Sequence, residues 1–350
     1  MLEVSGLTVE YAGITNAGAK NPVRAVDDVS FSVAAGEFVG IVGESGCGKS
    51  TLLFAVAQLL SPPATITAGS VTFHGQNLVT MTARRLNTIR WQNLSVVMQS
   101  AMNALNPVMS VGAQYADALR AHGMTSRKAI AARSAEVLRL VGIDAVHLKS
   151  YPHQLSGGMR QRAMIAMALL FTPDLVIMDE PTSALDVVAQ RSLMTQIKEL
   201  QREIGFAVVF VTHDMSLVSH YSDRLMVMYA GQVAELGLTR RIFDSPLHPY
   251  SRGLLEAFPG IRGPKVPLQG IPGAPPDLSV IPNGCRFHAR CPVKIPECET
   301  IAPALLDRDG VSVRCLLYAE NTVSAENTVS AENTVPTENG SGDQAKETAQ

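Results

Sequence analysis

The chain has 350 residues, more than one ordinary compact domain needs, and its 46% hydrophobic and 17% charged residues are typical of a globular protein. Lys and Arg number 29 against 31 Asp and Glu, and this net charge of −2 lacks the positive field of a general nucleic-acid-binding protein. No apolar run approaches the roughly 18 residues that cross a bilayer, and no basic stretch followed by an apolar one opens the sequence. We therefore expect a cytoplasmic chain that reaches a membrane only through a partner.

Hydrophobic patterning predicts a layered α/β domain with a helical insertion. In chain order, the pattern predicts short strands over 2–42, with a buried one at 38–42, and then a helix over 50–60. A mainly helical stretch follows over 90–150, with helices at 113–121 and 128–140. Buried strands are predicted at 175–178 and 207–211. A strand, a glycine-rich turn and a helix thus follow one another, and strands and helices alternate later in the chain. This order indicates an α/β fold.

The character of the sequence changes at about residue 240. Frequent prolines break any long element between residues 241 and 318, so we expect a loop-rich extension there. From Ala319 a polar hexapeptide, Ala-Glu-Asn-Thr-Val-Ser, occurs three times with one change in the last copy, which is too few and too hydrophilic for a solenoid. The predicted domains are therefore 1–240, 241–318 and a disordered tail, 319–350.

A glycine-rich segment after the strand at 38–42 has the pattern of a phosphate-binding loop. Residues 43–50 match G-x-x-x-x-G-K-[ST] in full. Backbone N–H groups of such a loop surround phosphates, Lys49 would reach the β- and γ-phosphates, and the Ser50 hydroxyl would bind Mg²⁺. Cys47 occupies a variable position, where we expect packing without chemistry. The nucleotide-binding candidates are Gly43, Glu44, Ser45, Gly46, Cys47, Gly48, Lys49, Ser50 and Thr51.

Two carboxylates follow the predicted strand at 175–178. Asp179, at the end of a buried strand, can hold the Mg²⁺ hydration shell. Glu180 is placed to orient and polarise an attacking water. A strand that ends in Asp-Glu is common on its own, but a phosphate loop about 130 residues earlier makes the pair specific.

An ordered set of further motifs resembles the ABC-type ATPases. The signature of that family is matched by Leu155-Ser156-Gly157-Gly158-Met159-Arg160-Gln161-Arg162. The other matching positions are Gln99 for the glutamine loop, Ser183-Ala184-Leu185-Asp186 for the D-loop, His213 for the switch histidine and Tyr11 for the aromatic residue that stacks on adenine. The resemblance covers about residues 2–235. It implies a P-loop NTPase fold of the ABC type, with a β-subdomain and a helical subdomain at about 100–162.

The resemblance also implies ATP, Mg²⁺ and a site shared by two ATPase domains that face each other head to tail. The γ-phosphate of ATP held by a partner would be contacted by Ser156, Gly157 and Gly158. His213 would help to hold the attacking water in line with Glu180, and Gln99 would link the metal to the helical subdomain. The implied Mg²⁺ ligands are Ser50, Gln99 and Asp179. Ser100-Ala101 departs from the acidic residue and proline that often follow the glutamine in relatives.

A closer resemblance is to the peptide-permease branch of that family, over about residues 1–318. It rests on Leu105-Asn106-Pro107, Val111-Gly112, Gln114, His248-Pro249-Tyr250, Leu254-Leu255, Gly270-Ile271-Pro272-Gly273 and residues 285–292. This branch implies an ATPase subunit on the cytoplasmic face of the cell membrane that powers a peptide importer. Its partners would be two transmembrane permease subunits, a second and commonly different ATPase subunit, and an extracytoplasmic solute-binding protein. Importers of nickel or glutathione are the alternatives within this class.

A soluble ABC ATPase that acts on DNA or the ribosome is a further alternative. The DNA-repair kind usually inserts a long coiled coil or zinc modules between phosphate loop and signature, whereas only about 105 residues, without sustained heptads, separate Ser50 from Leu155. The ribosomal kind carries two ATPase domains, and this chain has one. A regulatory module without turnover is disfavoured by the intact Lys49, Asp179, Glu180 and His213.

Four of the five cysteines cluster within about thirty residues of the extension, namely Cys285, Cys291, Cys298 and Cys315. Their spacing, C-x5-C-x6-C-x16-C, matches neither common zinc-finger pattern. Four thiolates could hold a [4Fe–4S] cluster or a structural Zn²⁺, with His288 able to replace one ligand, or they could be free thiols. Some members of the peptide-permease branch carry such a cluster, so we expect iron–sulfur in a structural role.

Overall fold

The computed structural model describes residues 1–13, 22–99, 104–183, 185–257 and 270–319. Met1–Tyr318 forms one compact unit. Ser100, Ala101 and Ala184, and the predicted tail beyond Ala319, lie outside the described residues.

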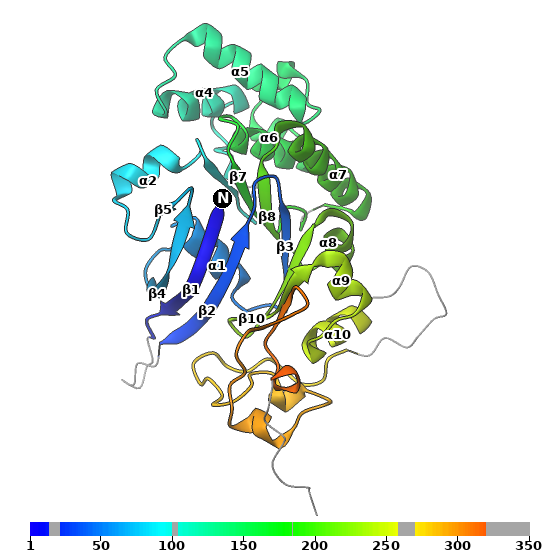
Figure 1. The fold of residues 1–350 in the computed structure, drawn as a ribbon. Helices are drawn as coiled ribbons and strands as arrows, with labels where there is room; N and C mark the ends of the chain where they lie inside the picture. Colours follow the sequence, from blue (N-terminus) through cyan, green and yellow to red (C-terminus); the bar gives the residue numbers. More distant parts are fainter. Residues whose placement is uncertain (14–21, 100–103, 184, 258–269, 320–350) are drawn as a thin grey trace, which may run out of the picture. The chain divides into compact units, whose positions relative to one another are not determined.

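Two β-sheets form the framework of the unit Met1–Tyr318 (Figure 1). The smaller sheet is antiparallel in the order β2-β1-β4-β5, and the larger has the order β11-β12-β10-β9-β3-β8-β7-β6, with the strands from β9 to β6 parallel. The smaller sheet consists of β1 (Leu2–Tyr11), β2 (Val23–Val33), β4 (Ala64–Phe73) and β5 (Gln76–Asn77). The larger consists of β3 (Phe38–Val42), β6 (Leu94–Val97), β7 (Leu175–Asp179), β8 (Ala207–Val211), β9 (Arg224–Tyr229), β10 (Gln232–Leu238), β11 (Leu306–Arg308) and β12 (Val311–Val313).

Strand β3 shows why the larger sheet is buried on both faces. Phe38 and Val42 belong to one hydrophobic core, and the alternate residues Val39 and Ile41 belong to a second core on the opposite face. The second core contains the smaller sheet and α1 (Lys49–Val56). The first core contains buried side chains from seven helices among the described residues. These are α4 (Val111–Ala121), α5 (Arg127–Leu140), α6 (Gly157–Ala168), α7 (Val187–Ile204), α8 (Met215–Tyr221), α9 (Thr239–Asp244) and α10 (Pro249–Glu256). A separate helix, α2 (Ala83–Ile89), contributes no fully buried residue.

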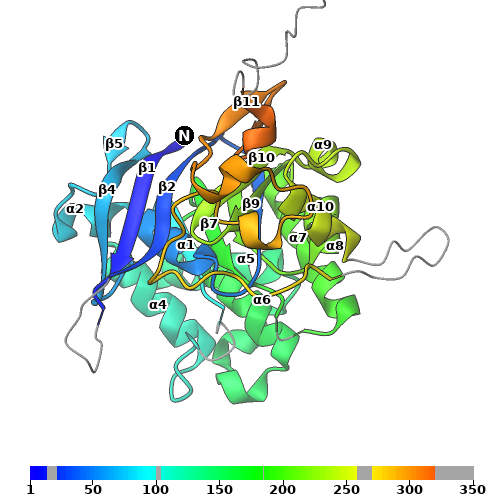
Figure 2. The same ribbon diagram turned by 90° about the horizontal axis from the view of Figure 1, so that it is seen from below.

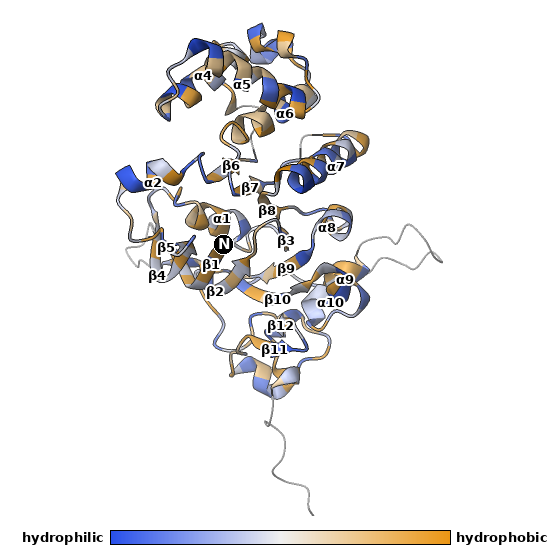
Figure 3. Ribbon diagram, turned by 45° about the horizontal axis from the view of Figure 1, so that its top comes forward, coloured by the Kyte–Doolittle hydropathy of each residue, from blue (hydrophilic) through white to orange (hydrophobic). Residues whose placement is uncertain are grey.

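Most predicted elements of the ATPase core are confirmed, but the helix predicted over 50–60 ends at Val56, and the stretch 90–150 predicted as mainly helical includes the strand β6. The strands at 38–42, 175–178 and 207–211 correspond to β3, β7 and β8, and the helices at 113–121 and 128–140 correspond to α4 and α5. Side-chain oxygens cap the first turns of α4, α5, α6 and α7, from Ser110, Ser126, Ser156 and Asp186. In Figure 3 the long helix α7 shows both hydrophobic and hydrophilic colour, as expected for a helix with one face against the core.

The C-terminal extension (residues 241–318) continues the larger sheet. Strand β12 pairs antiparallel with β10, so Glu235 lies opposite Val313, and Figure 2 shows the orange extension beside β10 and α10. The sequence predicted this region as loop-rich, yet it contains the helix α10 and the strands β11 and β12. Pro249 does not break that helix because it occupies the first turn, where no intrahelical N–H donor is required, and His248 caps the same turn.

Candidate active site

The phosphate loop (residues 43–50) connects β3 to α1 at the carboxyl end of the parallel strands. Gly48 has φ +101°, and a Cβ there would lie 2.1 Å from the carbonyl oxygen of Ala25. A Cβ on Gly43 would lie 2.2 Å from the carbonyl oxygen of Met228. Both positions therefore require glycine, because the loop runs directly against the backbone of β2 and β9.

Lys49 is folded back onto the loop. Its Nζ donates hydrogen bonds of 2.8 Å to the carbonyl oxygen of Gly43 and 2.9 Å to that of Glu44, and the residue is 8% exposed. Cys47 is buried beside it, and burial raises the pKa of its thiol. A buried, protonated thiol fits the packing role expected for Cys47, while the ammonium group of Lys49 stands where phosphate oxygens could replace the two carbonyls.

Ser50 and Asp179 meet across the strand ends. The Ser50 hydroxyl donates a 3.0 Å hydrogen bond to Oδ1 of Asp179, a residue that is 2% exposed. Burial, and next the charge of Glu180, raise the pKa of Asp179, while the hydrogen bond from Ser50 and the charge of Lys49 act in the opposite direction. A buried carboxylate and a hydroxyl are oxygen donors of the kind that Mg²⁺ prefers, so these residues fit that ion.

The two carboxylate oxygens of Glu180 face two different side chains. Oε2 accepts a 2.8 Å hydrogen bond from Nε2 of Gln99, and Oε1 lies 3.5 Å from Nδ1 of His213. The three come from the ends of β7, β6 and β8, which are adjacent in the sheet. Glu180 also has φ +47°, a left-handed conformation that is rare outside glycine and is concentrated at functional sites.

A pocket of 440 Å³ joins these groups. That volume is in the range of small-molecule sites. Its lining comprises Ala25, Gly43, Ser45, Gly46, Gly48, Lys49, Ser50, Thr51, Gln99, Glu180 and His213. The structure therefore brings together residues that lie more than 160 positions apart in the sequence, and all but Ala25 were candidates from the sequence.

Other predicted residues lie outside this lining. Tyr11 contacts the loop helix, with its hydroxyl 3.0 Å from Oγ1 of Thr51. Ser156 caps α6 by accepting a 3.3 Å hydrogen bond from the N–H of Met159, and Gly157 and Gly158 form the first turn of that helix. The signature is therefore not part of the pocket of its own chain.

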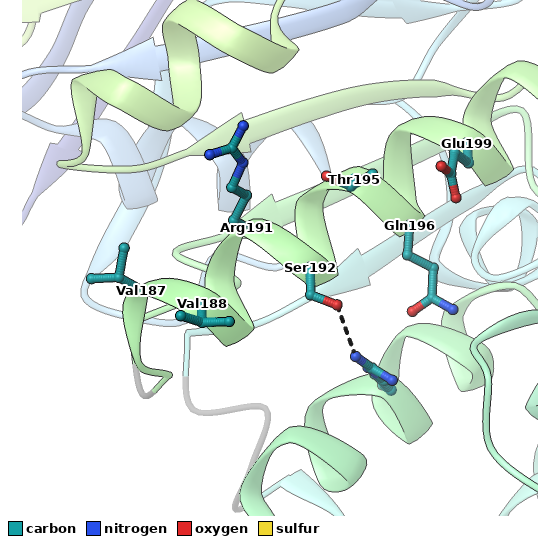
Figure 4. Close-up of a pocket in the computed structure, with 8 residues that line it drawn as sticks. Val187, Val188, Arg191, Ser192, Thr195, Gln196 and Glu199 are labelled. Atoms are coloured by element: carbon teal, nitrogen blue, oxygen red, sulfur yellow. Dashed lines mark hydrogen bonds between the residues drawn. The ribbon is translucent and has the colours of Figure 1, made fainter. Parts of the chain in front are cut away.

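A second hollow lies along α7 (Figure 4). Val187 and Val188, at the start of α7, are 78% and 80% exposed, and Arg162 of α6 donates a 3.2 Å hydrogen bond to the hydroxyl of Ser192. This hollow contains no residue of the phosphate loop and no group from the strand ends.

The four cysteines of the extension are neighbours but do not converge as metal ligands. All five cysteines of the chain are free thiols, and nowhere in the described ranges do three or more His, Cys, Asp or Glu side chains stand close enough to hold a metal ion. Burial, a backbone hydrogen bond and the neighbouring thiols together set the pKa of Cys285 at about 11, burial being the main cause of the rise. Nδ1 of His288 donates to the carbonyl oxygen of Cys285. The described residues therefore show no assembled set of metal ligands, and no step below depends on one.

Sequence reasoning missed two residues of the extension that contact the phosphate loop. Arg290 forms an ion pair with Glu44 through two hydrogen bonds, and the hydroxyl of Tyr250 accepts a 2.9 Å hydrogen bond from the N–H of Glu44. The sequence placed both residues in family motifs, but it carried no sign of a contact across more than 200 positions.

Comparison with known proteins gives matches over both the ATPase core and the extension. The family model described as ABC transporter matches residues 26–183, and the one described as oligopeptide/dipeptide transporter, C-terminal region, matches residues 234–298. No helix in the described part of the chain is both long and apolar enough to cross a membrane.

Individual relatives match over most of their length. The chain is 44% identical over 305 residues to the oligopeptide transport ATP-binding protein OppD of Salmonella typhimurium. The match covers 87% of this chain and 89% of OppD. The chain is 44% identical over 299 residues to the dipeptide transport ATP-binding protein DppD of Bacillus subtilis, spanning 84% and 89%. Among solved structures it resembles the dimeric post-hydrolysis state of the ATP-binding cassette MJ0796 bound to ADP and Pi, with a TM-score of 0.61 and 29% identity, covering 69% of this chain and 99% of that one.

Proposed function

This chain belongs to the ABC transporter ATP-binding proteins of the oligopeptide/dipeptide type, and on that premise we propose that it hydrolyses ATP to power a membrane importer for peptides. The observation that carries the proposal is a pocket lined by Lys49, Ser50, Gln99, Glu180 and His213, in a chain 44% identical to peptide-transport ATP-binding proteins. Asp179 is hydrogen-bonded to Ser50 at the same place.

The phosphate loop and the Ser50–Asp179 pair are proposed to hold ATP and Mg²⁺. Lys49 would exchange its two carbonyl partners for β- and γ-phosphate oxygens, and α1 would present its positive end to the same phosphates. Ser50 and Asp179 would hold the Mg²⁺, with Gln99 at its edge. When bound, the ion neutralises charge that develops on the phosphates.

Glu180 is proposed as the general base. One carboxylate oxygen faces Gln99 and the other faces His213, so the side chain is held from both sides at the edge of the pocket. A water placed between Glu180 and the γ-phosphate would lose its proton to the carboxylate during attack. Tyr11, at the end of β1, is the proposed stacking partner of adenine.

A second ATPase chain is proposed to complete the site. Ser156 is exposed at the N-terminus of α6 and lies outside its own chain's pocket, as a residue that serves a partner's γ-phosphate must. The related cassette MJ0796 is dimeric with ADP and Pi. We propose a head-to-tail dimer, and a heterodimer of two different ATPase chains in preference to a homodimer.

Transport requires partners that cross the membrane. We propose two transmembrane permease subunits that dock on the helical subdomain, an extracytoplasmic solute-binding protein, and a peripheral position for this chain on the cytoplasmic face. The names of the relatives, as subunits of peptide transport, support this assembly. Closure of the ATPase pair would expose the substrate path, and hydrolysis would reset it.

The iron–sulfur cluster stays a prediction from the sequence, with Zn²⁺ as its alternative. What supports it is the clustering of four cysteines within about thirty residues of the sequence, Cys285, Cys291, Cys298 and Cys315. Protein purified without oxygen should be brown, with about four iron atoms per chain. Colourless protein with stoichiometric zinc would establish the alternative, and metal-free protein would exclude both.

Peptide uptake tests the function. Cells that lack other peptide importers should take up labelled di- and oligopeptides with the wild-type chain and not with Glu180→Gln at equal protein level. Glu203→Gln, an exposed acid on α7, is the matched control and should transport normally. Uptake that survives Glu180→Gln would contradict the proposal, and the same assay with nickel or glutathione would then identify a different solute.

A further inference from the structure

Every polar group of Glu44 is engaged, and two of its four partners, Arg290 and Tyr250, belong to the C-terminal extension. The carboxylate receives Nη1 of Arg290 at 2.7 Å and Nη2 at 2.9 Å, and the N–H donates to the hydroxyl of Tyr250 at 2.9 Å. The carbonyl oxygen accepts hydrogen bonds of 2.9 Å from Nζ of Lys49 and 3.3 Å from the N–H of Cys47. The N–H of Glu44 shares its peptide group with the carbonyl of Gly43, which accepts a 2.8 Å hydrogen bond from Lys49. The extension therefore fixes a peptide group that holds the lysine of the phosphate loop.

Arg290 is itself held rigidly. Its Nε donates a 2.7 Å hydrogen bond to the carbonyl oxygen of Pro272, and Nη1 lies 3.3 Å from the hydroxyl of Tyr229. The Arg290 side chain is 6% exposed, against 25% for Glu44. Two parallel hydrogen bonds from a buried planar guanidinium define one orientation of the carboxylate, which a mobile surface ion pair could not do.

The ring of Tyr250 is fixed in the same region. Tyr250 is 0% exposed, and its ring centroid lies 4.5 Å from that of Tyr229 and 5.4 Å from that of Phe287. The hydroxyl that receives the Glu44 N–H is thus placed by an aromatic cluster contributed by β9, α10 and the turn between Cys285 and Cys291.

The same turn reaches the other end of the phosphate loop. Arg286, next to Cys285, forms an ion pair with Asp27 of β2 and donates to the carbonyl oxygen of Ala230. The neighbouring N–H of Gly231 donates a 2.9 Å hydrogen bond to the carbonyl oxygen of Cys47. One turn of the extension is therefore connected to both Glu44 and Cys47.

The geometry points to Arg290 and Tyr250 as positioning residues for ATP: the extension supports the phosphate loop from behind and sets its affinity for nucleotide. This inference rests on the proposed use of residues 43–50 as the phosphate site. Without Arg290 or Tyr250, the peptide group between Gly43 and Glu44 can rotate, and the carbonyls that hold the ammonium group of Lys49 ready for phosphate lose their fixed positions. The chemical step at Glu180 is left intact, so the loss is in binding.

Nucleotide titration of the full-length purified chain tests the inference, with mant-ATP and Mg²⁺ as the probe. Arg290→Lys keeps the charge but removes the planar fork, and Tyr250→Phe removes one hydroxyl while keeping the ring. Each should raise the Kd about tenfold, the effect of losing one charge-assisted or buried hydrogen bond. In the assembled transporter, both should raise the KM for ATP with kcat nearly unchanged.

Two controls separate this effect from general damage to the extension. Arg241→Lys alters an ion pair between α9 and Asp309 that does not touch the phosphate loop, and it should bind mant-ATP as wild type does. A Glu44→Gln/Arg290→Lys double variant should bind no more weakly than Arg290→Lys alone, because both changes break one interaction. Additive losses would overturn the inference.

Wild-type Kd values in folded Arg290→Lys and Tyr250→Phe would also overturn it. Lys49→Ala identifies which proposal has failed. If Lys49→Ala abolishes mant-ATP binding while Arg290→Lys and Tyr250→Phe bind normally, only the positioning role is wrong. If Lys49→Ala binds normally, the phosphate site itself is wrong.

Discussion

The side-chain amide of Gln99 donates a 2.8 Å hydrogen bond to the carboxylate of Glu180, 81 positions later in the chain. The contact forms because β6 and β7 are parallel neighbours, so both residues follow a strand at the same edge of the sheet. It connects the proposed base to the segment that leads into the helical subdomain.

Replacement of Gln99 by alanine should slow hydrolysis more than it weakens binding. Glu180 would keep only His213 as a partner, and a base that is less well oriented loses part of its contribution of about 100-fold or more. We expect kcat of the reconstituted transporter to fall about tenfold, with unchanged thermal stability because Gln99 is exposed. Gln76→Ala in β5 is the control, and a kcat equal to that of this control would exclude the role of Gln99.

Asp179→Asn should have opposite effects in the free and nucleotide-bound protein. Burial raises the pKa of Asp179 in the folded state, so folding favours the protonated carboxyl. The stability that Asp179 contributes is therefore full below the ordinary carboxyl pKa, and it is lost as the pH rises through the folded-state pKa. At pH 7 the asparagine variant removes an unfavourable buried charge and still accepts from Ser50, so the nucleotide-free protein should melt higher than wild type. With saturating MgATP the order should reverse, because the wild type binds more tightly. Thermal melts of both proteins with and without MgATP would show this reversal of Tm order. A nucleotide-free variant that melts below the wild type at pH 7 would contradict the prediction.

Gly48→Ala should destabilise the fold and abolish nucleotide binding. The new Cβ would lie 2.1 Å from the Ala25 carbonyl at a φ of +101°, so both a clash and backbone strain oppose it, at about 2 kcal/mol or more. Gly46→Ala is the matched comparison, since φ there is +78° but a Cβ meets nothing within 4 Å. Urea unfolding should show the smaller loss for Gly46→Ala, and equal losses would mean that the clash is relieved.

His248 should make the protein sensitive to acid. Burial lowers the pKa of His248 to about 4, so the stability linked to its neutral form is present above the ordinary histidine pKa and is lost as the pH falls toward 4. The difference amounts to about 3 kcal/mol across that window. His248→Asn keeps a cap for the N–H of Tyr250, so its free energy of unfolding, although lower at pH 7, should fall less between pH 6.5 and 4. Urea titrations along that pH series measure both slopes, and parallel slopes would show that His248 is not responsible.

The sequence could predict which candidate residues lie together where they are adjacent in the chain or follow neighbouring strands, and their chemical roles stay predictions. The phosphate loop and the Asp179-Glu180 pair are of this kind, since a turn after a strand and a carboxylate at a strand end are local patterns. The family resemblance supplied Gln99 and His213, and the parallel sheet explains why they meet Glu180.

The contacts of the extension could not be predicted in this way. Arg290 reaches Glu44 across 246 positions, and no periodicity or spacing relates the two. The prolines of the extension were read as breaks, although Pro249 begins a helix. Cysteine spacing alone likewise gave a possible ligand set but not the positions of the thiols, which depend on how the surrounding turns pack.

The pairing of β12 with β10 constrains how this chain can be divided. A protein truncated near residue 240 at the end of the ATPase core would lose β12, and β10 would become an exposed edge with Val233 and Leu236 beside open hydrogen-bonding groups. Edges of that kind recruit strands from other molecules. The isolated core would therefore tend to aggregate, and an evolutionary exchange of extensions between such ATPases would have to preserve the strand that covers β10.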